Sequence, residues 1–161
     1  MSVEIDIRDE SGEPLDALGD IEGDLGRFLG ILGEGEGELS IVFCDDKAIA
    51  RLNEQYRQVV APTDVLAFSQ SEGRSLPGQP VLGDLVISIP RAREQAMEAG
   101  HDLAAETRLL LAHGLLHLLG FDHTTPDEER RMNAETDRLL KGIGLHITIP
   151  NSMGGEEDEC G

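Results

Sequence analysis

The stretch that decides the fold runs from Leu109 to His123 and reads LLLAHGLLHLLGFDH. Its leucines and alanines occupy nearly every side of a helical projection, which predicts a helix that is buried all round. His113 and His117 are four residues apart, so their imidazoles lie on one face of that helix, one turn above the other. Gly120 can adopt the left-handed conformation that ends a helix. The chain can then turn back and bring His123 to the same point.

These three histidines predict a single metal site. Three neutral imidazoles with an open fourth position are typical ligands of a catalytic Zn²⁺, whereas structural zinc sites are closed by four ligands and rich in cysteine. A histidine on an apolar helix is otherwise a core or capping residue, but burying two imidazoles without partners would cost several kcal/mol. We therefore expect His113, His117 and His123 to bind one Zn²⁺ per chain.

The spacing H-x-x-x-H-x-x-G-x-x-H resembles that of the metzincin metalloproteases, in which a Glu follows the first His and acts as the general base. Gly114 stands at that position here. The version without Glu, H-G-x-L-H-L-x-G-F-D-H, resembles the signature of the YbeY family of bacterial endoribonucleases and matches at every defined position. The segments 52–57, 62–68 and 83–88 are similar to the same family, although Ala67 and Ser69 replace its more frequent Ser and Pro.

The YbeY resemblance implies a zinc-protease-like fold and a metal-dependent hydrolase that cleaves single-stranded RNA. Its implied roles are ribosomal RNA maturation, including processing of the 3′ end of 16S rRNA, and ribosome quality control. Its implied partners are ribosomal RNA and the small ribosomal subunit or its proteins. The family pattern also places a functional cation at Arg57, beside the metal cleft, where a guanidinium can bind a phosphate through two hydrogen bonds. Without the resemblance, Arg57 would be an exposed residue at a helix end.

Two other functions remain open at this point. The metzincin spacing favours a metallopeptidase, but Gly114 in place of the general base opposes it. The other alternative is a non-catalytic, ribosome-associated factor in which the metal only holds the fold together. Asp122 could orient a ligand imidazole or serve as a loop carboxylate, while His101 and His146 lie outside the signature and need no function.

Periodicity predicts an α+β domain with about four strands in a mixed sheet and helices packed against it. Strands are expected at 3–7, 38–43 and 82–88, with another ending near 69. Helices are expected at 15–32, from a cap at Asp45 or Asp46 to Arg57, at 90–99, from near Asp102 to the stop at Gly120, and from Thr125 to Gly142. One domain should span residues 1–150, and the acidic tail 151–161 is too polar to fold alone.

Charge opposes a role with RNA at first sight. The 161 residues include 32 acidic and 13 basic side chains, a net charge of −19 that repels phosphate at long range. Twelve of these acids lie in residues 1–38 and four in 151–161, which leaves residues 39–150 with a net charge of only −5. We therefore expect an arginine-bearing cleft beside the metal within a negative surface.

The remaining sequence features favour the cytoplasm and no membrane association. No segment has the apolar length of a membrane span or the pattern of a signal peptide. The only two cysteines, Cys44 and Cys160, form neither a ligand pair nor a disulfide framework.

Overall fold

A four-stranded sheet forms one layer of the computed structural model, which describes residues 3–12, 18–33, 37–56, 65–69, 81–121, 125–147 and 149. The strands are β1 (Val3–Asp9), β2 (Gly37–Cys44), β3 (Val65–Ser69) and β4 (Val81–Ser88), in the order β1-β2-β4-β3. Strands β1, β2 and β4 run parallel, and β3 pairs antiparallel with β4 at the edge.

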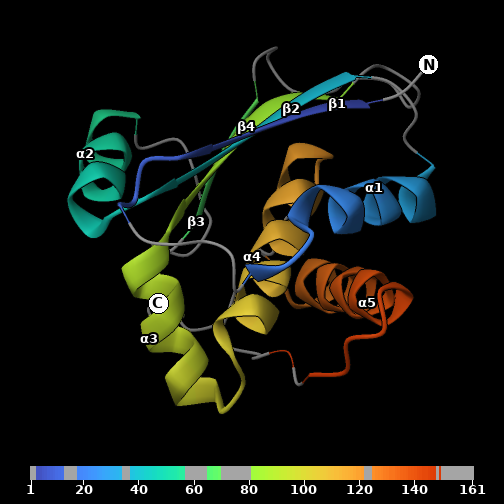
Figure 1. Cartoon of the computed structure of the whole chain (residues 1–161). Coiled ribbons are helices and arrows are strands. Elements are labelled where there is room, and N and C mark those ends of the chain that lie inside the picture. The colour runs from blue at the N-terminus through green and yellow to red at the C-terminus, as the bar shows by residue number, and fades with distance from the viewer. Residues whose placement is uncertain are drawn as a thin grey trace.

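Five helices accompany the sheet in the described part of the chain (Figure 1): α1 (Ile21–Leu32), α2 (Asp46–Tyr56), α3 (Ile89–Ala99), α4 (Leu103–Leu118) and α5 (Pro126–Gly142). The expected α+β class is confirmed. None of these helices is long and apolar enough to cross a membrane.

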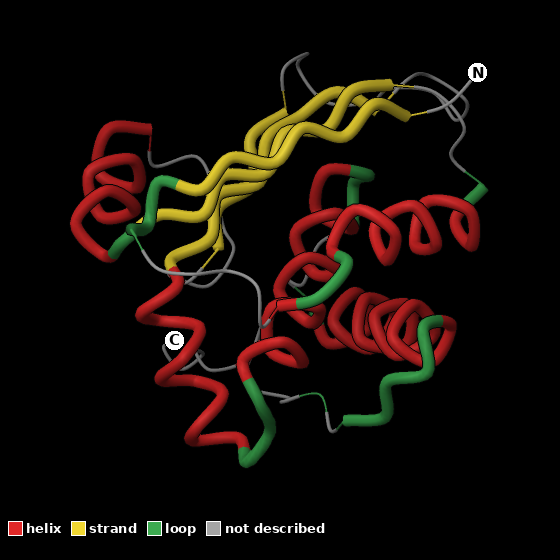
Figure 2. The backbone as a smooth tube through the Cα atoms, viewed as in Figure 1, coloured by secondary structure: helices red, strands yellow, loops and turns green. Residues whose placement is uncertain are grey.

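The two faces of the sheet bury different helices because successive side chains of a strand point to opposite faces. Leu85 belongs to the main core, which α1, α4 and α5 cover from one side (Figure 2). Its neighbour Val86 belongs to a smaller cluster on the other face, where Ile49 of α2 packs against it and Cys44. Helix α4 therefore lies inside the molecule, between the sheet and α5.

The ends of α4 follow the sequence signals. The Asp102 side chain accepts a hydrogen bond from the Ala105 amide at 2.9 Å, which caps the helix start. At the other end, Gly120 has φ of 102°, a conformation that strongly favours glycine. The predicted starts of α3 and α5 are likewise confirmed, with Ser88 and Thr125 as capping residues.

Helix α1 is shorter than its apolar spacing predicts. The helix begins at Ile21 rather than near Leu15, because Asp20 caps it by accepting from the Gly23 amide at 3.0 Å. Gly19, with φ of 79°, breaks the helical path just before the cap. Leu18 is nevertheless only 1% exposed. Because Leu18 belongs to the core, the apolar spacing resembles that of a helix even before the start of α1 at Ile21.

Two buried ionisable groups of α4, Glu106 and Arg108, tie the helix to its neighbours. Arg108 donates from Nε to Asp24 of α1 at 2.8 Å, while His101 Nε2 and Glu106 Oε1 lie 2.6 Å apart. Glu106 and Arg108 are 3% and 6% exposed. Sequence reasoning assigned them no role, although a charged residue within a helix that is buried all round requires a partner.

Helix α4 packs closely against the sheet at Gly114. A Cβ atom at this position would lie 2.9 Å from Leu85 Cδ2 and 3.4 Å from Val65 Cγ2. Both of these strand residues are 0% exposed and have little room to move. Glycine is therefore required here by packing against β3 and β4.

We predict that Gly114→Ala lowers the free energy of unfolding by about 1 kcal/mol, because overpacking a core costs about 1–3 kcal/mol and exceeds the gain in helix propensity. The matched control is Gly26→Ala, in the middle of α1, where a Cβ would meet nothing within 4 Å. That variant should gain about 0.5–1 kcal/mol. Urea unfolding measures the free energy of unfolding of both variants. An equal gain in stability from the two substitutions would contradict the close packing at Gly114.

Burial raises the pKa of Glu106 above its usual 4.5, although the hydrogen bond and charge of His101 act in the opposite direction. Since the folded-state pKa is the higher one, the ionised carboxylate costs stability above that pKa. The cost disappears as the pH falls from the raised value towards 4.5. Glu106→Gln should therefore be more stable than the wild type at neutral pH, by a margin that shrinks on acidification. Parallel stability–pH curves of the two proteins would refute this.

Candidate metal centre

Two of the three expected metal ligands lie together on α4. The ring centroids of His113 and His117 are 5.0 Å apart, and the ring planes are inclined at 76°. His113 is 1% exposed, and His117 is half-buried. The pair therefore extends from the core towards the surface along one face of the helix.

This arrangement fits a shared metal ion. Two imidazoles on a tetrahedral Zn²⁺, each with a Zn–N distance of about 2.0–2.1 Å, would have ring centres about 5 Å apart. The described part of the chain holds no group of three or more potential ligands of the His, Cys, Asp and Glu types. His123 and Asp122 belong to residues 122–124, which lie outside the described residues, so the third ligand stays a prediction.

The two ends of the segment that carries His123 are well defined. On one side, the Phe121 amide donates to the Leu116 carbonyl at 3.0 Å, which ties the turn back onto α4. On the other side, the Thr125 hydroxyl accepts from the Glu128 amide at 3.1 Å and starts α5. The expected third ligand is thus carried by a three-residue connection between the end of α4 and the start of α5.

Arg57 lies outside the described residues, so the expected arginine-bearing cleft stays a prediction. The structure does show how the helix before Arg57 is positioned. Ser88 donates from Oγ to Asp46 at 2.7 Å, which ties the first turn of α2 to the start of α3. Helix α2 ends at Tyr56, one residue before Arg57.

The other candidate ligands among the described residues belong elsewhere. Cys44 is buried beneath α2, where burial and then the charges of Asp45, Glu10 and Asp46 raise the pKa of its thiol to about 11. This thiol is protonated at neutral pH and is a poor metal ligand. His101 pairs with Glu106 at the start of α4, and His146 is exposed.

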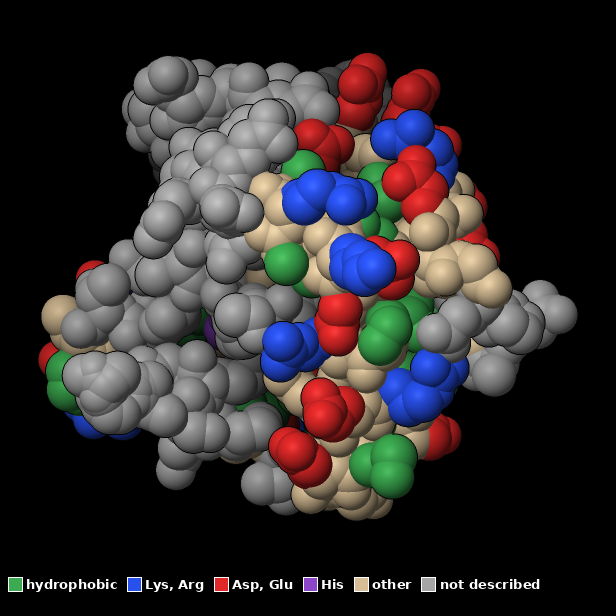
Figure 3. All heavy atoms as spheres, turned by 90° about the vertical axis from the view of Figure 1, so that its left-hand side faces the viewer, with side chains coloured by type: hydrophobic (Ala, Val, Ile, Leu, Met, Phe, Trp, Pro, Cys, Tyr) green, Lys and Arg blue, Asp and Glu red, His purple; other side chains and the backbone are tan. Residues whose placement is uncertain are grey.

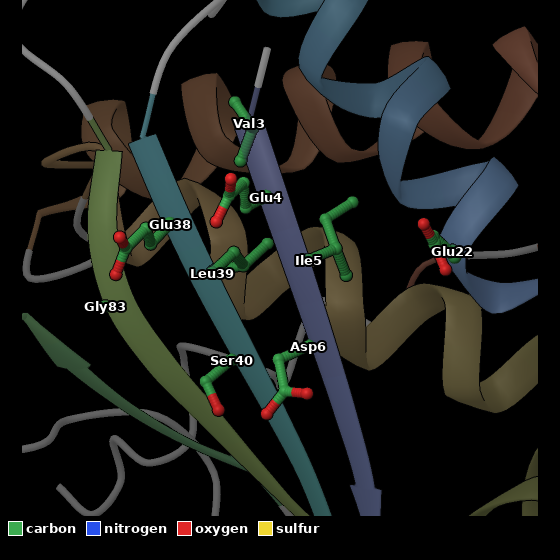
Figure 4. Close-up of a pocket in the computed structure, with 9 residues that line it drawn as sticks. All are labelled: Val3, Glu4, Ile5, Asp6, Glu22, Glu38, Leu39, Ser40 and Gly83. Carbon is green, nitrogen blue, oxygen red and sulfur yellow. The ribbon is translucent and has the colours of Figure 1, made fainter.

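A separate cavity of about 610 Å³ lies against β1 and β2 (Figure 4). Its described lining residues include the carboxylates of Glu4, Asp6 and Glu38 on the sheet and of Glu22 on α1, and none of them is a lysine or arginine. Glu4 and Glu38 are direct neighbours in the parallel register. Such a cavity repels a phosphate, so it is a poor candidate for a nucleic-acid site.

Comparisons with known proteins support the resemblance seen in the signature. Residues 27–144 match the family model described as Endoribonuclease YbeY. A protein named Endoribonuclease YbeY from Symbiobacterium thermophilum is 46% identical over 127 residues, which cover 74% of this chain and 81% of the relative. The protein of the same name from Geobacillus thermodenitrificans is 40% identical over 156 residues, or 90% and 99% of the two chains.

The fold is also similar to a solved structure. The solution structure of a Thermotoga maritima protein superimposes with a TM-score of 0.52, at 20% identity, over 85% of this chain and 89% of the other. At this level of identity the similarity concerns the fold alone.

We predict that His117→Ala loses the metal and part of the stability together, because metal binding contributes free energy only to the folded state. Metal analysis of the purified variant should show far less than the one Zn²⁺ per chain expected of the wild type. Chelation should lower the melting temperature of the wild type but not of His117→Ala. The control is His146→Ala, whose exposed imidazole lies outside the pair. A His117→Ala variant with full zinc content would exclude this ligand.

Proposed function

Because the chain belongs to the Endoribonuclease YbeY family, we propose that it is a zinc-dependent endoribonuclease that cuts single-stranded ribosomal RNA. Its proposed roles are processing of the 3′ end of 16S rRNA and ribosome quality control, in the cytoplasm and in association with the small ribosomal subunit. The observation that carries the proposal is the imidazole pair on α4, which sits within the family signature with 5.0 Å between ring centroids.

His113, His117 and His123 are the proposed ligands, each as a neutral imidazole. When bound, Zn²⁺ would supply Lewis acidity to the phosphate and lower the pKa of a coordinated water. A proposed zinc-protease-like arrangement of the site agrees with helical ligands four residues apart and a third ligand beyond a glycine turn.

Arg57 is the proposed catalytic cation. The scissile phosphodiester is already anionic and gains charge during cleavage, so a guanidinium that holds two of its oxygens stabilises the transition state more than the ground state. Position 114 offers no carboxylate that could act as the zincin general base. Charge stabilisation by Arg57 therefore takes a larger share of the catalysis in this proposal.

The metallopeptidase alternative is opposed by packing as well as by sequence. General acid–base help typically contributes about 10²–10⁴-fold to a rate, so peptide hydrolysis without the base at position 114 should be weak. In the non-catalytic alternative the metal only holds the fold, so chelation should destabilise the protein but leave RNA processing unchanged. Nuclease and peptidase assays on one preparation, with and without chelator, separate the three functions.

Arg57→Ala should lower RNA cleavage by at least about tenfold, as the loss of one charge-stabilising donor usually does, while zinc content and melting temperature stay near the wild type. Arg57→Lys should recover only part of the rate, because an ammonium cannot make the two-point contact. Single-turnover cleavage of a labelled single-stranded RNA measures both. A wild-type rate in Arg57→Ala would show that the proposed mechanism is wrong.

A further inference from the structure

Most cations of the described residues are already neutralised by carboxylates. Of their eleven lysine and arginine side chains, seven lie within 4.0 Å of a carboxylate oxygen: Arg8, Arg27, Arg91, Arg108, Arg130, Arg138 and Lys141. Among the described residues Lys47, Arg51 and Arg131 have no such ion pair and are exposed, and of these three Lys47 and Arg51 lie together on α2. They are therefore available to a polyanion without the loss of an existing contact.

The two side chains form one basic ridge on α2. They are four residues apart, so they lie one above the other on the same side of the helix, about 6 Å apart at Cβ. Ile49, midway between them in sequence, lies on the opposite side and is buried against Cys44 and Val86. This anchoring turns the Lys47–Arg51 ridge away from the sheet.

The ridge lies along the first half of α2. With a rise of about 1.5 Å per residue, Arg51 lies about 8 Å before the helix end at Tyr56, and Lys47 about 6 Å further back. Figure 3 views the molecule from the side where α2 and α3 lie in Figure 1. Lysine and arginine side chains are interspersed there with acidic ones, and a histidine is visible from the same side.

We propose that Lys47 and Arg51 bind two phosphates of the RNA substrate along the outer face of α2. This inference rests on the proposed function and extends its substrate-binding surface beyond the scissile phosphate. The contacts are independent of base sequence, because a cation on a phosphate carries no sequence information. They supply local attraction that a chain with a net charge of −19 otherwise lacks.

The test compares two double variants of the full-length zinc protein. Lys47→Gln with Arg51→Gln removes the ridge. Arg138→Gln with Lys141→Gln removes two exposed cations of α5 and changes the net charge equally. Fluorescence anisotropy measures binding of a short oligouridine RNA across a salt series, with the RNA checked for integrity on a gel.

Loss of the ridge should weaken RNA binding about tenfold at low salt and reduce the slope of log K against log salt by about 1.4, or 0.7 for each phosphate contact on a single strand. In cleavage assays the loss should raise KM. The swapped variant Lys47→Arg with Arg51→Lys should keep the wild-type slope, because it keeps both charges. The α5 variant should also bind like the wild type.

Four outcomes would overturn the proposal. An unchanged affinity and salt slope after loss of the ridge, in a wild-type protein that binds and cleaves RNA, refutes the ridge alone. If the α5 variant loses as much RNA affinity as the ridge variant, the effect is one of general charge. If the ridge variant loses as much affinity for polyglutamate as for RNA, the ridge is a site for acidic protein. A wild type that neither binds nor cleaves RNA refutes the proposed function and the ridge with it.

Discussion

The close contact between α4 and the sheet at Gly114 is the constraint on which the rest of the structure depends. With no side chain there, the helix comes so near to Leu85 and Val65 that a single added carbon would meet them at 2.9 and 3.4 Å. The residues around this contact are sealed from solvent, including His113 at 1% exposure. One helical turn after His113, the side chain of His117 is half-buried. The depth of the imidazole pair is thus set by how closely the helix packs.

The same contact gives a physical reason why the zincin general base is absent. A glutamate at position 114 would direct its carboxylate between two fully buried aliphatic side chains, and burying an unpaired charge is far more costly than burying an apolar group. Restoring the base would require the helix to move away from β3 and β4. The imidazole pair would move with it. Tight packing of α4 on the sheet therefore excludes a carboxylate at position 114, and this chain has the tight packing.

Local signals predicted the elements well, because each signal acts within a few residues. Asp102 caps the start of α4 with a hydrogen bond, and Gly120 follows its end with a positive φ. Both signals can be inferred from the sequence. Leu18 misled the prediction, since a core residue outside a helix can share the spacing of one inside it. The order of strands, with β3 beyond β4, depends on long-range pairing that periodicity does not encode. The spacing of His113 and His117 was sufficient to place both side chains, whereas His123 and Arg57 follow helix ends, where spacing carries little geometric information.

Electrostatics in this protein is decided locally rather than by net charge. At physiological salt the potential of an exposed charge decays over about 8 Å, so acids on β1 and α1 have little influence on a phosphate bound at a distant helix. Nearer the site, a cation that is already paired with a carboxylate must break that ion pair before it can bind a phosphate. Arg91 is such a paired cation, because its Nε lies 3.5 Å from Asp46. Lys47, the next residue after Asp46, has no such ion pair. An acidic protein can therefore attract RNA wherever its few unpaired cations lie within one Debye length of the strand.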